Sequence, residues 1–301
     1  MKVNDKVYRV LNSTSLGYQL YSQEDQEISI HPNRRKITYH GEKIVIGDFV
    51  LVDDQGMISE VLPRKNYLER PRLSNCDIAY VIVSLKEPMF SSYLLDKFLS
   101  FLSFHNIPSG IILTKADLLS KKEMNSIKKR VSYYERLSFP VYFINAHDEK
   151  KFDFPSLKEE IKGKTIAFVG QTGVGKSSLI NLLCPDFQRK VDALYVSSGR
   201  GRHTTKEIIL LPFLDGFIFD TPGFSELELR EVKSLDFAHC FPGYDEYSKD
   251  CYFKDCCHLE NSKDCGIHKA IEKDELSSES YENYLRIIKE VKINDLWKKK
   301  I

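Results

Sequence analysis

Gly170-Gln171-Thr172-Gly173-Val174-Gly175-Lys176-Ser177 is the stretch that decides the fold. It matches the pattern G-x-x-x-x-G-K-[ST], in which a glycine-rich loop cradles phosphate groups. The apolar run 164–169 before it predicts a strand, and 176–183 predicts a helix. A loop between a strand and a helix N-terminus points backbone N–H groups and the positive end of the helix dipole at an anion. The alternative, a glycine-rich turn beside an ordinary surface lysine, fits this context less well.

Each part of the loop has a predicted task. Its glycines permit positive φ and a close approach of the backbone to phosphate. Lys176 is expected to bridge β- and γ-phosphate oxygens, and the Ser177 hydroxyl to coordinate Mg²⁺. The predicted nucleotide contacts here are Gly170, Gln171, Thr172, Gly173, Val174, Gly175, Lys176, Ser177 and Ser178.

Two segments upstream favour guanine as the base. Thr114-Lys115-Ala116-Asp117 follows an apolar run and resembles the [NT]-K-x-D motif of GTPases. There the Asp117 carboxylate accepts hydrogen bonds from guanine N1–H and its exocyclic amine, a donor pair that adenine lacks. Asn145-Ala146 ends the next apolar run and resembles the [ST]-A loop that contacts guanine O6. A P-loop ATPase is the rival interpretation.

Two segments downstream resemble the switches of GTPases. Asp220-Thr-Pro-Gly223 matches D-x-x-G, so Asp220 is expected to hold Mg²⁺ through water and the Gly223 N–H to sense the γ-phosphate. The segment 201–205 between the phosphate loop and Asp220 offers Thr204 or Thr205 as a further Mg²⁺ ligand. The alternative is that 189–206 is simply a basic solvated loop. The predicted Mg²⁺ ligands are Ser177, Asp220 and one of Thr204 and Thr205.

The catalytic residues are harder to assign. Phe224 follows D-x-x-G where Ras-like enzymes have a glutamine that orients water, so intrinsic hydrolysis is expected to be slow. His203 is the candidate replacement, alongside Lys176, Thr204 and Thr205; the alternative, that His203 contacts only RNA or solvent, stays open. A partner that orders the first switch is expected to act as the activator.

A metal site is predicted near the C-terminus. Cys251-x4-Cys256-x-His258-x6-Cys265 supplies three thiolates and one imidazole, a set that suits a closed, tetrahedral, structural Zn²⁺ site. The adjacent Cys257 is expected to point elsewhere. A region with few large apolar residues benefits from one such metal ion. Free buried cysteines are the alternative.

The remaining pattern predicts three regions. Five short apolar runs within residues 1–70, of which the fourth is 43–52, predict five strands in a small barrel of the OB type, with a β-sandwich or SH3-like barrel as alternatives. Residues 63–73 are expected to be a linker. Longer apolar runs alternate with helical segments from 77 to 220 and predict a mostly parallel sheet. Strands are expected at 77–85, 109–115, 139–146, 164–170, 206–213 and 216–220, and helices at 92–104, 122–137, 155–162, 176–183 and, capped by Ser277 or Ser278, at 277–291.

The order of the motifs is unusual. Both base segments precede the phosphate loop, whereas in ordinary GTPases they come last. All these elements are loops at the carboxyl edge of one sheet, so rejoining the termini elsewhere preserves the site. The chain is therefore predicted to be a circularly permuted GTPase, a multidomain α/β protein.

The composition and the N-terminal residues bear on the partners and the location of the protein. The formal net charge is +1, from 44 basic and 43 acidic residues, so bulk charge neither predicts nor excludes a nucleic-acid partner. The N-terminal residues MKVNDKVYRV contain no apolar signal segment, and no apolar run approaches 18 residues. We expect a cytoplasmic monomer without a membrane partner.

Taken together, the motifs resemble the RsgA family (YjeQ or YloQ), the ribosome small-subunit-dependent GTPases. The resemblance rests on T-K-x-D before the phosphate loop, GRGRHTT at 199–205, D-T-P-G-F at 220–224 and the Cys₃His spacing. It implies an OB domain at 1–68, a permuted GTPase domain at 69–228 and a zinc-binding helical domain at 229–301. It also implies GTP hydrolysis to GDP, stimulated by the small (30S) subunit, late in the maturation of that subunit.

The resemblance makes 16S rRNA the expected partner surface. Candidate contacts are the basic segments 34–36 and 189–206, although both are equally compatible with solvated faces. A rival of another class is an RNA-binding module that keeps nucleotide only as a structural ligand, which Phe224 makes a serious alternative.

Overall fold

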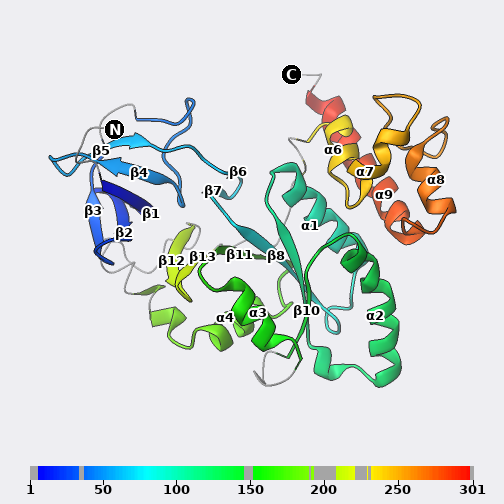
Figure 1. The fold of residues 1–301 in the computed structure, drawn as a ribbon, viewed down its shortest axis with the longest axis horizontal. Coiled ribbons are helices and arrows are strands. Elements are labelled where there is room, and N and C mark those ends of the chain that lie inside the picture. Colours follow the sequence, from blue (N-terminus) through cyan, green and yellow to red (C-terminus); the bar gives the residue numbers. More distant parts are fainter. Residues whose placement is uncertain are drawn as a thin grey trace. The chain divides into compact units, whose positions relative to one another are not determined.

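The computed structural model describes residues 6–33, 37–145, 152–189, 191–192, 208–220, 229 and 232–298. They form the helices and strands drawn in Figure 1 and divide into two compact units. Unit 1 comprises Met1–Ile78, Lys158–Phe168 and Ser177–Phe224, and unit 2 comprises Ala79–Leu157, Val169–Lys176 and Ser225–Ile301.

The N-terminal part of unit 1 is a five-stranded antiparallel sheet in the order β3-β2-β1-β4-β5. A parallel bridge between Asn33 and Ile58 joins the end of β3 to β5. This order and closure are those of the predicted OB-type barrel. The strands are β1 (Lys6–Thr14), β2 (Gly17–Ser22), β3 (Ile28–His31), β4 (Phe49–Val52) and β5 (Ile58–Val61).

The fourth barrel strand is shorter than the apolar run 43–52 suggests. Gly47 has a φ of 92°, and the backbone N–H of Val45 donates to the Asp48 carboxylate at 2.9 Å. A side chain at position 47 would meet the Ser74 carbonyl oxygen at 2.3 Å, so only glycine fits there. The chain turns at Gly47 and enters β4 only at Phe49.

The prediction of a plain linker at 63–73 is wrong. The segment contains the hairpin of β6 (Tyr67–Glu69) and β7 (Arg72–Ser74), whose Leu68 and Leu73 are buried. Arg64 also forms an ion pair with Asp48 at 2.8 Å, and both side chains are almost fully buried. These contacts attach the segment to the barrel, which a sequence rich in arginine and proline does not reveal.

The predicted parallel strands are confirmed. Of one six-stranded sheet, unit 2 holds the parallel strands β10-β9-β8, while unit 1 holds β11 and β13 in parallel with β12 antiparallel at the edge. The strands are β8 (Ile78–Ser84), β9 (Ser109–Thr114), β10 (Val141–Ile144), β11 (Thr165–Val169), β12 (Ile209–Phe213) and β13 (Gly216–Asp220).

The predicted helices form at nearly the predicted positions. Ser91 caps the first by accepting from the Leu94 N–H, and Ser120 and Glu123 form a capping box at the second. Between the strands lie α1 (Ser92–Phe104), η1 (Ala116–Leu118), α2 (Lys121–Arg136), α3 (Phe154–Ile161) and α4 (Lys176–Leu183).

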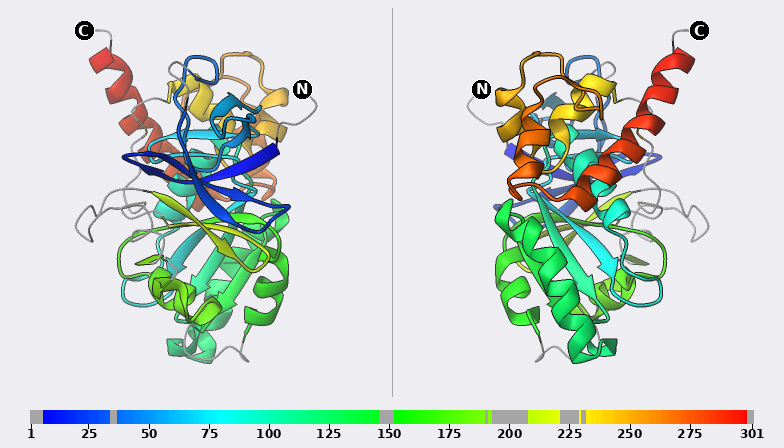
Figure 2. Two further views of the ribbon diagram at one scale, coloured as in Figure 1. Left: turned by 90° about the vertical axis from the view of Figure 1, so that its left-hand side faces the viewer. Right: turned by 90° about the vertical axis from the view of Figure 1, so that its right-hand side faces the viewer.

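The C-terminal region of unit 2 is helical, as predicted (Figure 2). It is less dependent on a metal than its sequence suggests, because Phe237, Phe241, Tyr244 and Tyr284 form a fully buried aromatic cluster. Ser277, not Ser278, caps the last helix by accepting from the Ser280 N–H. The elements are α6 (Ser234–Cys240), α7 (Tyr244–Tyr247), η2 (Ser248–Asp250), α8 (Gly266–Glu272) and α9 (Ser278–Lys298).

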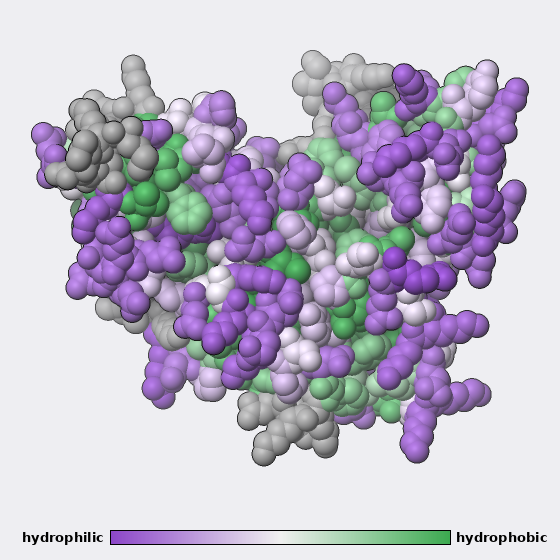
Figure 3. Space-filling view, viewed as in Figure 1, coloured by the Kyte–Doolittle hydropathy of each residue, from purple (hydrophilic) through white to green (hydrophobic). Residues whose placement is uncertain are grey.

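Hydrophilic residues cover most of the face drawn in Figure 3. Within the part of the chain described above, no helix combines the length and the apolar character needed to cross a membrane.

A fully buried carboxylate, Asp96, joins α1 to α2 and α9. It accepts hydrogen bonds from the Tyr134 hydroxyl at 2.8 Å, from the Asn283 amide at 2.8 Å and from the Ser280 hydroxyl at 3.1 Å. Burial outweighs these bonds and raises the pKa of Asp96 to about 7. The folded protein therefore keeps a proton that the unfolded chain releases, and the stability contributed by Asp96 declines as the pH rises through 7.

We predict that Asp96→Asn removes this pH dependence. Between pH 5 and pH 8 the stability of the variant relative to the wild type should rise by about 2–3 kcal/mol, since each pH unit below the folded pKa of about 7 is worth on the order of 1.4 kcal/mol and the difference levels off above it. Thermal unfolding midpoints of both proteins at several pH values measure this difference. Asp245→Asn, at an exposed carboxylate on α7, is the matched control. A difference between Asp96→Asn and the wild type that does not change with pH would contradict the prediction.

Candidate functional site

The phosphate loop lies between β11 and α4, as predicted. Gly170 has a φ of 147°, and a Cβ there would meet the Ile82 carbonyl oxygen at 2.3 Å. Gly173 and Gly175 have φ values of 82° and 96°. Three glycines are thus needed for the path of the backbone, which leaves the loop's N–H groups available to an anion.

Lys176, the first residue of α4, lies folded over this loop. Its ammonium donates to the carbonyl oxygens of Gly170 and, at 2.7 Å, of Gln171. Burial lowers the pKa of the half-buried lysine. The loop carbonyls hold the cation where phosphate oxygens can replace them as its partners.

The base segment and the phosphate loop are tied together within unit 2. The Thr114 hydroxyl donates to the Val174 carbonyl oxygen at 2.5 Å. Lys115 adopts a left-handed conformation with a φ of 58°, and its ammonium donates to the Glu87 carbonyl. The short side chain of Thr114 therefore holds the phosphate loop against the carboxyl end of β9.

The other described base residues follow the same two strands. Ala116 is buried at the start of η1, and the carboxylate of the next residue, Asp117, is exposed. Asn145 is buried directly after β10. Since β9 and β10 are parallel neighbours, their carboxyl ends bring Asp117 and Asn145 to one edge of the sheet.

The predicted Mg²⁺ ligands that the structure describes belong to unit 1. Ser177 is exposed in the first turn of α4, and Asp220 is the last residue of β13. Burial raises the pKa of the Asp220 carboxyl. A neighbouring cation is the usual means of keeping such a carboxylate ionised.

Several predicted residues lie outside the described part of the chain. They include the switch residues and part of the second base segment, so their roles stay predictions. These residues are Ala146, His203, Thr204, Thr205, Gly223 and Phe224.

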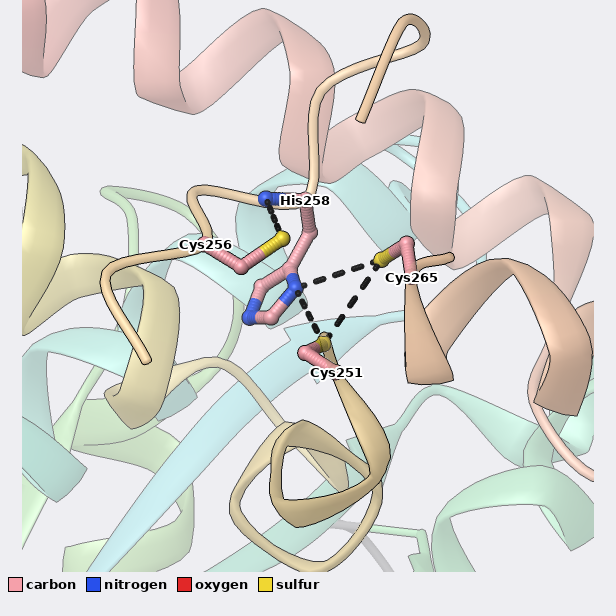
Figure 4. A group of neighbouring side chains, drawn as sticks. All are labelled: Cys251, Cys256, His258 and Cys265. Atoms are coloured by element: carbon pink, nitrogen blue, oxygen red, sulfur yellow. Dashed lines mark hydrogen bonds between the residues drawn. The ribbon is translucent and has the colours of Figure 1, made fainter. Parts of the chain in front are cut away.

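The four predicted metal ligands converge in unit 2 (Figure 4). The ligand atoms of Cys251, Cys256, His258 and Cys265 all lie within 4.8 Å of one another. Cys251 follows η2 and Cys265 precedes α8, whereas Cys256 and His258 come from the connecting loop. Such a group can hold one metal ion.

The spacing of these atoms fits tetrahedral zinc. The Sγ atoms of Cys251 and Cys265 are 3.9 Å apart, and they lie 3.5 Å and 3.4 Å from His258 Nδ1. A tetrahedron with Zn–S bonds of about 2.3 Å and Zn–N bonds of about 2.0–2.1 Å has edges of about 3.8 Å and about 3.6 Å. The Sγ–Sγ distance also excludes a disulfide between the two cysteines.

The groups around the cluster also favour binding of a metal ion. The His258 and Gly266 N–H groups lie 3.4 Å and 3.2 Å from the Sγ atoms of Cys256 and Cys251. The Ser248 hydroxyl lies 3.1 Å from His258 Nε2 and so fixes the ring with Nδ1 toward the cysteines. Burial lowers the pKa of His258 to about 4, so the imidazole is a neutral ligand at physiological pH.

Sequence reasoning missed the residues that hold these ligands. Besides Ser248, the Tyr281 hydroxyl donates to the His258 carbonyl at 3.1 Å and the Tyr284 hydroxyl to the Cys257 carbonyl at 2.6 Å. Both tyrosines lie on α9, more than twenty residues away, and no spacing rule links them to the cluster. The prediction that Cys257 points elsewhere is confirmed, because its Sγ contacts the Asp255 carbonyl and is not part of the group.

Comparison with known sequences gives a consistent result. A sequence model of the family described as RsgA GTPase matches residues 61–230. A protein from Malacoplasma penetrans named small ribosomal subunit biogenesis GTPase RsgA is 35% identical over 294 residues, which cover 96% of this chain and 100% of the relative. A protein of the same name from Latilactobacillus sakei is 36% identical over 299 residues, which cover 97% of this chain and 98% of the relative.

Solved structures share the fold over nearly the whole length. The crystal structure of YloQ, described as a circularly permuted GTPase, has a TM-score of 0.78 and 28% identity and covers 96% of both chains. That of YjeQ from Thermotoga maritima has a TM-score of 0.81 and 29% identity and covers 96% of this chain and 99% of that one. The predicted fold class, including the circular permutation, is confirmed.

Proposed function

The chain belongs to the RsgA GTPase family and is a GTP hydrolase, and from this premise we propose that it acts in the late maturation of the small ribosomal subunit. The observation that carries the proposal is the 35% identity, over 96% of the chain, to a protein named for small ribosomal subunit biogenesis. The partners in this proposal are the 30S subunit and its 16S rRNA, and the site of action is the cytoplasm, with the chain as a monomer.

The nucleotide site is proposed to consist of the residues that the sequence motifs indicate. Asp117 selects guanine, and the Thr114–Val174 hydrogen bond keeps the base segment in register with the phosphate loop. Lys176 binds phosphate oxygens, while Ser177, Asp220 and Thr204 or Thr205 hold the Mg²⁺ that accompanies GTP. That ion neutralises charge on the β- and γ-phosphates. Asn145, Ala146 and Gly223 complete the contacts.

We propose that the free protein hydrolyses GTP slowly and that the ribosomal partner accelerates hydrolysis. Phe224 can neither orient nor polarise water, so we propose that His203 performs this task when the segment 201–205 contacts rRNA. The basic segments 34–36 and 189–206 are the proposed rRNA contacts.

The proposed domains are the OB barrel at 1–68, the permuted GTPase domain at 69–228 and the zinc domain at 229–301. The support for zinc as the metal is the near-tetrahedral spacing of the Cys251, Cys256, His258 and Cys265 ligand atoms. One structural Zn²⁺ per chain stabilises the loop 251–265 in this proposal.

Asp117→Asn tests the proposed recognition of the guanine base. The variant loses the acceptor for the exocyclic amine of guanine and gains in its place an amide N–H that can donate to the O2 of xanthine, so preference should move from guanosine to xanthosine nucleotides by at least about 100-fold. Wild-type protein should pellet with purified 30S subunits when bound to a non-hydrolysable GTP analogue and much less when bound to GDP. The variant should do so only with the xanthosine analogue.

Asp245→Asn, which alters an exposed carboxylate on α7, is the control for the base preference. Pelleting of Asp117→Asn with the GTP analogue at wild-type levels would contradict the assignment of Asp117. Pelleting of the wild-type protein that does not depend on the nucleotide would contradict a nucleotide-controlled role on the subunit.

A further inference from the structure

Unit 1 contains a cavity of about 470 Å³ that the nucleotide site does not use. Residues of β1, β2 and β4 of the barrel and residues at the amino ends of β11 and β13 line it. The phosphate loop follows the opposite, carboxyl end of β11. The volume is within the range of about 300–1,000 Å³ that small-molecule and cofactor sites enclose.

A buried cation lines this cavity. Arg9 on β1 is only 4% exposed, and its Nη2 donates to the Asn75 carbonyl at 2.9 Å and to the Thr165 hydroxyl at 3.4 Å. Its Nε has no hydrogen-bond partner. Burial lowers the pKa of Arg9 to about 10, so the group remains charged at neutral pH.

The carboxylates around the cavity are occupied by other cations. Asp77 pairs with Lys65 at 3.1 Å, and Asp215 pairs with Lys162 at 3.7 Å. Glu24, the remaining acidic residue of the lining, is exposed. Among the residues that the structure describes, none forms an ion pair with Arg9. The charges of Asp77 and Asp48 stabilise the Arg9 cation electrostatically without bonding to it, and burial still outweighs their effect. A buried guanidinium that lacks a bonded counter-ion favours an anionic ligand, because burial of such a charge is costly.

Aromatic rings form much of the remaining wall. The Phe49 ring lies 4.2 Å from the Arg9 guanidinium carbon, and the rings of Tyr21 and Phe217 meet edge to face at 5.4 Å. Tyr8 also lines the cavity. Such walls accept a flat ring by stacking, and the two phenol hydroxyls offer hydrogen bonds to its polar edge.

We propose that this cavity binds a single nucleotide, with its phosphate toward Arg9 and its base against the aromatic walls. The nucleotide is either a free mononucleotide or an unpaired nucleotide of an RNA chain, since both present the same base and phosphate. This site is separate from the guanine nucleotide site, and the proposal does not depend on the ribosomal function.

The first test uses the full chain saturated with GDP and Mg²⁺, so that the phosphate loop is already filled. Calorimetric titration with UMP should show one binding event, and uridine, which lacks the phosphate, should bind at least about tenfold more weakly. No binding of UMP up to about 10 mM, a free energy weaker than about −3 kcal/mol, would overturn the proposal.

Two variants assign the binding to the cavity. Arg9→Gln should weaken UMP binding at least about tenfold by removing the cation. Because Arg9 also joins the barrel to β11, the second variant leaves it intact: Gln23→Trp places a large ring at an exposed lining position and should weaken UMP binding to a similar extent. Glu24→Gln, which removes an exposed carboxylate, should strengthen it about two- to threefold at low salt.

UMP binding that is unchanged in both Arg9→Gln and Gln23→Trp would overturn the proposal and leave Arg9 a purely structural role. The source of the nucleotide follows from a comparison of UMP with a single-stranded oligouridylate. Tighter binding of the oligonucleotide, lost in Gln23→Trp, identifies an RNA chain as the ligand. Tighter binding of UMP identifies the free nucleotide.

Discussion

Lys176→Ala is expected to lower the rate of GTP hydrolysis by about 10²–10³-fold, the usual effect of removing one group that stabilises charge in the transition state. The loop carbonyls of Gly170 and Gln171 now hold the Lys176 ammonium where phosphate oxygens can take their place. Alanine leaves the loop's backbone intact, because its path is set by the glycines and by the Thr114–Val174 hydrogen bond. GTP affinity should also fall, since the lysine is proposed to contact phosphate in the ground state as well.

Single-turnover and multiple-turnover hydrolysis, together with nucleotide titration, measure this prediction. Lys122→Ala, which removes an exposed lysine on α2, is the matched control and should behave as the wild type. If Lys176→Ala retained hydrolysis within about threefold of the wild type, Lys176 would not be the phosphate-binding group of this enzyme.

Loss of the metal should unfold the loop that carries the Cys₃His group. Structural zinc sites contribute about 10–16 kcal/mol of binding free energy, and this energy is also folding energy. Burial raises the pKa of the Cys265 thiol to about 12, so without a cation the buried thiolate is strongly disfavoured. Cys265→Ser should therefore remove one zinc ion per chain and abolish hydrogen-exchange protection across 251–266.

The rest of the C-terminal region should respond differently. The rings of Phe237, Phe241, Tyr244 and Tyr284 also pack on one another, so α6 and α9 should keep most of their protection. Cys257→Ser is the control, because Cys257 Sγ contacts the Asp255 carbonyl and lies outside the metal group. Metal content by mass spectrometry distinguishes the two variants. One zinc ion retained in Cys265→Ser, or lost in Cys257→Ser, would refute the assigned ligand set.

The sequence was sufficient to predict those elements that a local residue pattern specifies. The strands buried on both faces, the capped helices at 92–104 and 122–137, and the glycine loop are specified by residues close together in the chain, and each forms at the predicted place. The Cys₃His cluster was also predictable, because all four ligands lie within fifteen residues.

Contacts between distant segments could not be predicted in this way. The strand expected at 43–52 is broken because Gly47 packs against Ser74, and the supposed linker is held by the Arg64–Asp48 ion pair. Asp96 and its partners on α2 and α9 are up to 187 residues apart. No local pattern marks such contacts, since they depend on which elements pack together.

The measurement that bears most directly on the account is multiple-turnover GTP hydrolysis by the wild-type protein, with and without purified 30S subunits. Because Phe224 replaces the water-orienting glutamine, the free protein should turn over slowly, and saturating subunits should accelerate it at least about tenfold. Large ribosomal subunits at the same concentration should not. A rate that 30S subunits leave unchanged would contradict the account, and a chain that binds the subunit without hydrolysing GTP would instead be an RNA-binding module with a structural nucleotide.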